Sequence, residues 1–197
     1  MRELSLHILD VVENGITAGA DCIAVRVEES APDDRLQITI QDNGRGIPAE
    51  KIRSVDDPFV TTRTTRRVGL GLSLLSAAAR RCGGDITVNA PPGGGTEVTA
   101  WFRRGHIDRA PLGDMAATLG MLILGNPHVD FVYVHRLDQN EFSLDTRDIK
   151  KQLEDVPLND PAVIQHITAS IRRSLHDLAG GDIHATTRED TDGKDDH

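Results

Sequence analysis

The chain has 197 residues, which is enough for one domain of ordinary size and a small second unit. Hydrophobic residues make up 38% and charged residues 27%, a composition that supports a packed core and excludes disorder of the whole chain. The net charge of −9 disfavours nucleic-acid binding, whose phosphate contacts need Lys and Arg. No apolar run reaches membrane-spanning length, no signal-peptide pattern is present, and Cys22 and Cys82 have no paired spacing, so we expect a cytoplasmic protein without a membrane span.

The first hundred residues predict alternating helices and strands. Apolar residues at helical spacing predict a helix at 4–18, whose second stripe, with His7, Asp10 and Asn14, is polar and expected to face solvent. Period-two alternation predicts the strands, and the element order predicts an α+β sandwich with its helices on one sheet face. The predicted order is helix 4–18, strands 23–28 and 36–41, short helix 49–55, polar loop to 68, helix 71–82, and strands 85–89 and 96–103.

The sequence changes character after Arg104, and the pattern predicts a small α/β extension there. The expected division is a domain at 1–104, the extension at 105–179, and a disordered acidic tail at 180–197. Within the extension we predict helix 113–124, a hairpin of strands 131–135 and 141–144, and helices 146–154 and 161–178. Five possible metal ligands have no spacing typical of a metal site, and solvated surface residues are the favoured interpretation: His106, Asp108, His128, Asp130 and His135.

A glycine-containing motif directly follows the second predicted strand: Asp42-Asn43-Gly44-Arg45-Gly46-Ile47-Pro48. Its glycines let the backbone approach a flat ligand, and Asp42 is suited to accept a hydrogen bond from an amino group in a dry slot. For this motif alone, an ordinary Asp-Asn-Gly turn between strands is an equally good interpretation.

A second glycine motif, Gly69-Leu70-Gly71-Leu72, opens a predicted helix after a loop rich in Thr and Arg. Glycines allow the backbone to close on phosphates, and a helix N-terminus adds free N–H groups and positive dipole. The loop supplies hydroxyls and positive charge from Thr61, Thr62, Arg63, Arg66 and Arg67. The alternative is a flexible solvated loop before a glycine-rich helix start.

Asp10 and Asn14 form a third candidate pair, one turn apart on the first helix. An amide oxygen is a good Mg²⁺ ligand, and a carboxylate one turn away can orient or deprotonate a nucleophile. An ordinary polar helix face is the alternative when the pair is taken alone.

Together, the motifs resemble the ATP-binding module shared by gyrase B subunits, heat-shock chaperones, histidine kinases and MutL-type proteins, called the GHKL or Bergerat fold. Residues 9–20 resemble its first motif in the form found in MutL-type proteins, and 42–46 resemble its adenine-binding motif. The segments 58–63 and 69–74 are similar to the lid and second glycine motif of histidine kinases. Together with 83–86 and 94–97, which resemble the closing strands, the match covers roughly residues 2–104.

The resemblance implies ATP and Mg²⁺ as cofactors. Asn14 would be the Mg²⁺ ligand, Asp42 would bind the adenine amino group, and Thr96 would add a hydroxyl near the base. Gly44, Gly46 and Ile47 would line the base pocket. The phosphates would be covered by Thr61, Thr62, Arg63, Arg66, Arg67, Gly69, Leu70, Gly71 and Leu72. Asp10 stands where hydrolysing members usually carry Glu and histidine kinases often carry Asn, so the carboxylate chemistry is kept with a shorter reach.

The chain also departs from complete members of these families. We expect a stand-alone module, because the motifs begin at residue 2 without the preceding phosphoacceptor helix pair of histidine kinases, and without a long transducer domain. His7 lies on the nucleotide helix and is interpreted as local structure. His176-Asp177-Leu178 only faintly resembles a phosphoacceptor motif and follows the module instead of preceding it.

Three functions remain open at this point. The first is a stand-alone ATPase or kinase of the histidine-kinase type that acts on a separate partner protein. The second is an interaction module in which ATP closes the lid at 57–68 and turnover is incidental. The third, a MutL-like DNA-associated ATPase, is disfavoured by the acidic charge.

Overall fold

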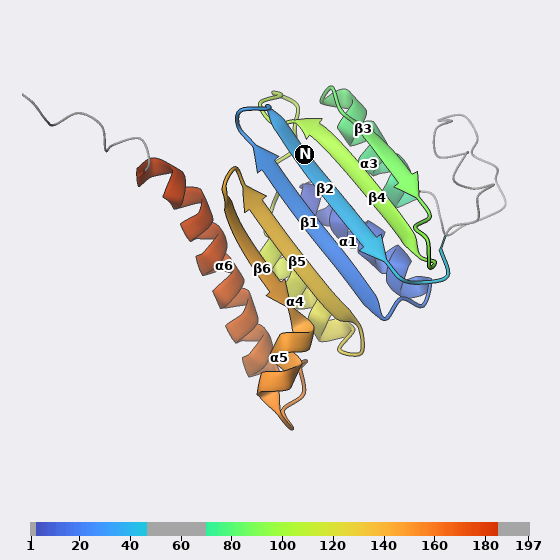
Figure 1. Ribbon diagram of the computed structural model, residues 1–197, viewed down its shortest axis with the longest axis vertical. Coiled ribbons are helices and arrows are strands. Elements are labelled where there is room, and N and C mark those ends of the chain that lie inside the picture. The colour runs from blue at the N-terminus through green and yellow to red at the C-terminus, as the bar shows by residue number, and fades with distance from the viewer. Residues whose placement is uncertain (1–2, 47–69, 185–197) are drawn as a thin grey trace, which may run out of the picture.

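In the described residues six strands form one mixed sheet (Figure 1). Helices cover one of its faces, which is the α+β arrangement that the sequence predicts. The computed structural model describes residues 3–46 and 70–184, so the predicted helix at 49–55 and the lid lie outside the described residues. The elements are α1 Leu4–Thr17, β1 Cys22–Ser30, β2 Arg35–Asp42, α3 Leu70–Arg81, β3 Asp85–Asn89, β4 Thr96–Arg103, α4 Met115–Gly125, β5 Asp130–Leu137, β6 Asn140–Asp145, α5 Thr146–Leu153 and α6 Pro161–His184.

The sheet joins the two predicted halves of the chain. Its strand order is β3-β4-β2-β1-β5-β6, and every neighbouring pair is antiparallel except β1 and β5, which run parallel. Val27 in β1 therefore faces Ile38 of β2 on one side and His135 of β5 on the other. The extension after Arg104 thus continues the same sheet, and the expected division at 104/105 falls between β4 and α4 without interrupting it.

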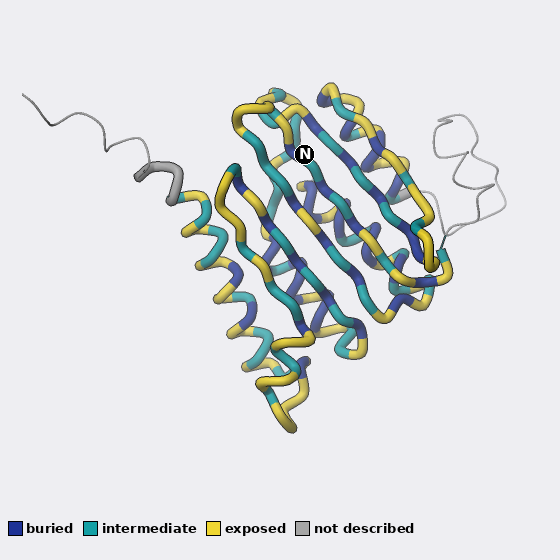
Figure 2. Tube along the Cα trace, viewed as in Figure 1, coloured by how far each residue is buried: buried dark blue, intermediate teal, exposed yellow. Residues whose placement is uncertain are grey.

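The core lies between the sheet and the helix layer, where alternate strand residues are buried (Figure 2). Ile23, Val25 and Val27 of β1 point into it, which agrees with the predicted alternation. One continuous cluster contains α1 and β1–β4 residues together with residues of α4, β5 and α6, so the two halves share a core. None of the described helices is long and apolar enough to cross a bilayer.

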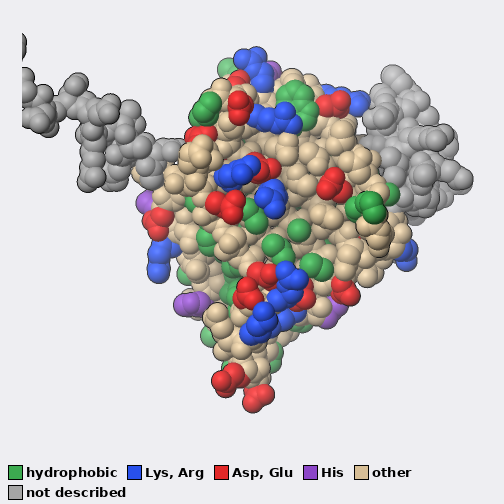
Figure 3. Space-filling view, viewed as in Figure 1, with side chains coloured by type: hydrophobic (Ala, Val, Ile, Leu, Met, Phe, Trp, Pro, Cys, Tyr) green, Lys and Arg blue, Asp and Glu red, His purple; other side chains and the backbone are tan. Residues whose placement is uncertain are grey.

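None of the described helices covers the other sheet face, which is seen directly in Figure 3. Its side chains are mostly polar or charged: Thr39 and Thr99 lie with their hydroxyls 3.4 Å apart, and the Arg35 guanidinium lies 5.1 Å from the Trp101 ring centre. Alternation along each strand therefore separates an apolar face from a largely polar one.

Three expectations about the helices and their surroundings need correction. His7 is buried rather than solvent-facing, because α1 contacts both α3 and α4 and its flank is covered as well as its core stripe. His135 is also buried, on the core side of β5, and is not a surface residue. The last helix, α6, continues past Leu178 to His184, so the first residues of the predicted disordered tail are helical.

Candidate functional site

The loop after β2 forms the first wall of the site. Asp42 ends β2 beside Thr96, the buried first residue of β4, and its Oδ1 accepts a hydrogen bond from the Gly44 N–H at 2.9 Å. The Arg45 N–H donates to the carbonyl of Ala18 at 3.1 Å, which fixes the loop against the end of α1. The loop thus holds one oxygen of the Asp42 carboxylate in a defined place.

Close backbone contacts leave no room for side chains in this wall. A Cβ on Gly46, whose φ is +74°, would lie 2.7 Å from the Gly95 carbonyl oxygen. A Cβ on Gly95, whose φ is +87°, would lie 1.9 Å from the Asp42 carbonyl oxygen. Glycine is needed at both positions because of the conformation and because of the space. The turn between β3 and β4 therefore packs directly on the loop after β2.

The polar pair of α1 lies against both glycine motifs. A Cβ on Gly15 would meet the Asp42 Cβ at 2.9 Å, and a Cβ on Gly71 would meet the Asp10 Cβ at 3.0 Å. The same Cβ on Gly71 would lie 3.8 Å from Asn14 Nδ2. The structure thus brings together Asp10, Asn14, Asp42 and Gly71, which the sequence offered only as separate motifs.

The start of α3 contributes backbone groups. Gly71 lies in its first turn, where N–H groups of a helix have no partner within the helix. Leu72 is buried in the core, where its side chain supports the helix. The remaining predicted phosphate and base residues lie outside the described residues: Ile47, Thr61, Thr62, Arg63, Arg66, Arg67 and Gly69.

Two residues of the site were missed by the motif reasoning. Asn43 accepts hydrogen bonds from the N–H groups of Asp21 and Cys22, each at 3.0 Å, and so attaches the loop to the start of β1. Gly15 provides the space in which the Asp42 side chain lies. Each stands next to a residue that the motifs singled out, but only the three-dimensional contacts reveal its role.

The remaining histidines have other surroundings. His135 lies with Nδ1 2.9 Å from the Tyr133 hydroxyl and Nε2 3.3 Å from Glu29, whose other oxygen accepts from Arg104 at 3.2 Å. The hydrogen bond with His135 holds the pKa of Glu29 below its ordinary value, against the effect of burial, and burial raises the pKa of Tyr133. Asp130 accepts from Lys150, and His176 is exposed. Within residues 3–46 and 70–184 no three potential ligands gather into a metal site.

Comparison with known proteins agrees with this geometry. Residues 2–106, just over half of the chain, match the family described as "Histidine kinase-, DNA gyrase B-, and HSP90-like ATPase". An uncharacterised sensor-like histidine kinase of Rhizobium meliloti is 35% identical over 102 residues, 49% of this chain and 19% of that protein. The nitrogen regulation protein NtrY of Azorhizobium caulinodans is 39% identical over 80 residues, 40% of this chain and 10% of that protein.

The matching segments therefore span less than a fifth of each of these two relatives. Among solved structures, the ATP-binding domain of PrrB from Mycobacterium tuberculosis aligns with a TM-score of 0.37 at 22% identity, over 51% of this chain and 67% of that one. The family match covers α1, the loop after β2, the start of α3 and the turn before β4, the elements that meet at the site. The chain belongs to the histidine kinase-, gyrase B- and HSP90-like ATPase family, with an ATP-binding domain of the type found in histidine kinases.

Proposed function

We propose that the chain binds Mg-ATP at the meeting point of α1, the loop after β2 and the start of α3, and acts as an ATPase or kinase on a separate partner protein. The observation that carries the proposal is the contact geometry of the three motifs. Asp42 faces Gly15 of α1, and Asp10 and Asn14 of the same helix face Gly71. Binding of Mg-ATP needs a contact for the base, a ligand for the metal and a helix N-terminus for the phosphates within one site.

Each side chain has a defined task in this proposal. Asp42 accepts a hydrogen bond from the adenine amino group, and its carboxylate is already oriented by Gly44. Asn14 offers its amide oxygen to Mg²⁺, which when bound neutralises phosphate charge. Asp10 aligns the attacking water or partner side chain and accepts its proton. The residues present fit the metal, because the Asn14 amide, which carries an oxygen ligand, lies beside Gly71 in the first turn of α3, where phosphates are stabilised.

A comparison of ATP with adenosine tests the site. Asn14→Ala should weaken ATP binding in the presence of Mg²⁺ but leave adenosine binding unchanged, because only phosphate-bound metal touches this side chain. Isothermal calorimetry with both ligands, with and without Mg²⁺, measures the difference. Equal losses for ATP and adenosine would show instead that the substitution damages α1.

The second function, a nucleotide-gated interaction module with little turnover, is favoured by one observation. Asp10 is shorter by one methylene than the Glu usual in hydrolysing members, and its Cβ is already packed beside Gly71. We expect Asp10→Asn to abolish turnover while ATP still binds. ATP turnover by the purified protein, alone and with cell extract, separates the two functions: if bound ATP is not consumed in either case, the protein is the interaction module.

A further inference from the structure

Both ends of the Asn43 amide side chain are hydrogen-bonded within the protein. Its Oδ1 accepts from the N–H groups of Asp21 and Cys22, and its Nδ2 donates to Asp21 Oδ1 at 2.5 Å. The Asn43 N–H also donates to the Cys22 carbonyl at 3.3 Å. Four hydrogen bonds therefore attach this one residue to the start of β1, although both Asn43 and Asp21 are exposed to solvent.

The position of Asn43 determines the position of Asp42. The two residues share a peptide bond, and the Gly44 N–H that holds the Asp42 carboxylate follows directly. A peptide plane is rigid, so a displacement at residue 43 moves both neighbours. Geometry within a nucleotide pocket must hold to fractions of an ångström, and residues behind the contacting groups set it.

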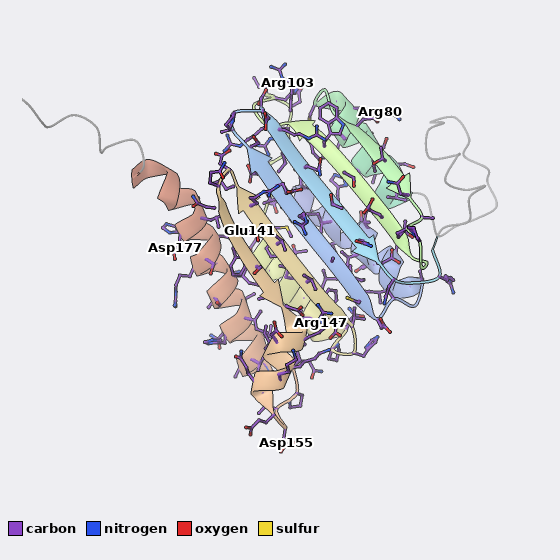
Figure 4. The ribbon with its side chains drawn as sticks, viewed as in Figure 1. Arg80, Arg103, Glu141, Arg147, Asp155 and Asp177 are labelled. Carbon is purple, nitrogen blue, oxygen red and sulfur yellow. The ribbon has the colours of Figure 1, made fainter. Side chains whose placement is uncertain are left out.

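The series of hydrogen bonds that includes Asn43 and Asp21 continues into the extension. The Asp21 carbonyl accepts from the Asp130 N–H at 2.8 Å, and Asp130 Oδ1 accepts from Lys150 Nζ at 2.6 Å. Asp130 begins β5 and Lys150 lies on α5, both outside the segment matched by the family. Figure 1 shows α5 below β6 and β5, at the lower end of the sheet, where β1 and β5 begin, and Figure 4 labels Arg147 of α5 there.

We propose that Asn43 is a positioning residue of the nucleotide site, and that the C-terminal extension supports it through Asp130 and Lys150. The inference rests on the proposed function, because it concerns the same site. Its consequence is that α5, on the far side of Asp21 from the nucleotide loop, influences nucleotide affinity without touching the nucleotide. The coupling is reciprocal, so bound nucleotide also stabilises the contact between Asp21 and Asp130.

An exchange of Asn43 and Asp21 tests whether Asn43 is a positioning residue. Asn43→Asp keeps the acceptor for the N–H groups of residues 21 and 22 but places two carboxylates against each other. At low ionic strength, we expect it to weaken ATP and adenosine binding on the order of tenfold, as for residues in direct contact. Adding Asp21→Asn restores a donor opposite the new carboxylate, and both affinities should return to within about threefold of wild type.

The outcomes of this exchange are distinct. Rescue by the second substitution supports positioning, because the pair works again with its roles reversed. If Asp21→Asn does not rescue Asn43→Asp in a folded protein that still binds weakly, Asn43 acts by direct contact with the ligand and the inference is wrong. If the wild-type protein binds neither ATP nor adenosine, the proposed function itself fails.

Two lysines of α5 test whether the extension supports Asn43, one as the test variant and the other as its matched control. Lys150→Met removes the bond to Asp130, whereas Lys151→Met removes the pair with Asp148, 2.9 Å long and exposed on both sides. We expect about a threefold loss of ATP affinity for the first variant and none for the second, the size typical of a partly exposed ion pair. Calorimetry in the full chain gives both values. Equal affinities for the two variants would show that the extension does not support the site.

Discussion

The loops at the two ends of the sheet differ in their main contacts, although Gly84 also lies against the Trp101 carbonyl at the end away from the site. Where β2 ends and β4 begins, glycines bring backbone against backbone, as at Gly46 and Gly95. At the opposite end, side-chain ion pairs join the strands and turns, among them Arg103 with Asp34 at 3.0 Å and Arg104 with Glu29 at 3.2 Å (Figure 4). A hollow of about 800 Å³ also lies there between the two hairpin tips, lined mostly by charged and polar side chains.

The two ends therefore offer different surroundings to a ligand. A flat base binds where the backbone can approach it closely and a carboxylate is shielded from water. A hollow lined by exposed charged side chains stays hydrated. The described residues Asp10, Asn14, Asp42 and Gly71 of the family motifs lie near one another at the end where β2 ends and β4 begins. The first two predictions below test that end, and the last two test the ion-paired end and its connection to the core.

The largest effect is expected from Gly95→Ala. The new Cβ would lie 1.9 Å from the Asp42 carbonyl oxygen, in a conformation with φ +87°. The loop must shift or stay strained, so the free energy of unfolding should fall by about 2–3 kcal/mol and ATP binding should be lost. Urea unfolding and calorimetry measure both quantities.

Gly93→Ala is the matched control for this prediction. Its φ is also positive, at +108°, but no atom lies within 4 Å of the new Cβ. It should therefore show only the conformational cost of about 1 kcal/mol and retain ATP binding. Similar losses of stability and of ATP binding in the two variants would mean that backbone strain, and not contact with the Asp42 loop, causes the effect of Gly95→Ala.

Asp42→Asn should have the next largest effect, confined to nucleotide affinity. It replaces a charge-assisted hydrogen bond worth about 1.5–3 kcal/mol, so ATP binding should fall by at least about tenfold. The asparagine oxygen can still accept from the Gly44 N–H, so the thermal midpoint should remain close to that of wild type. Unchanged ATP affinity in the folded variant would remove Asp42 from the site.

Tyr133→Phe should affect stability and spare the nucleotide. The Tyr133 hydroxyl is 2.9 Å from His135 Nδ1 and both side chains are buried, so its removal leaves a buried ring nitrogen without this partner. A loss of about 1–2 kcal/mol in unfolding free energy is expected, with ATP affinity unchanged. In a His135→Leu background the same substitution should cost less, because no polar ring atom remains; an equal cost would point to packing alone.

The smallest effect concerns the pH dependence of stability. The hydrogen bond with His135, assisted by Arg104, keeps the pKa of folded Glu29 below its unfolded value. Glu29 therefore contributes stability above the unfolded pKa of about 4.5, and this contribution is lost as the pH falls through the lower folded pKa. Urea midpoints measured downward from pH 7 should decline less steeply in Glu29→Gln. Parallel curves for the two proteins would contradict this.

The sequence predicted what is encoded locally. Alternation in β1 and β2, the apolar stripe of α1 and the glycine ends of the loops depend on neighbouring residues, and these elements are confirmed within one or two positions. Asp42 and Asn14 are likewise singled out by local spacing, Asp42 after a strand and Asn14 on a helix. That α1 lies against the loop after β2 follows only from tertiary packing.

Errors arose where distant segments determine the environment. His7 was assigned to a polar helix face, but α3 and α4 cover that flank. His135 looked like a surface residue until β5 placed it beside Tyr133 and Glu29 in the core. Asn43 was noticed only as part of a turn motif, since its partners Asp21 and Cys22 precede it by some twenty residues. None of these contacts has a signature in a short stretch of sequence.

The parallel pairing of β1 with β5 has a consequence for synthesis on the ribosome. β1 forms its hairpin with β2 early, but its other edge pairs with residues that emerge more than a hundred positions later. At about 5–20 residues per second, that edge stays open for several seconds. An open central strand such as Val25 to Val27 is a template for pairing with other chains. The nascent chain is therefore most prone to aggregation just before β5 is complete, and truncation after Arg104 would make that brief state permanent.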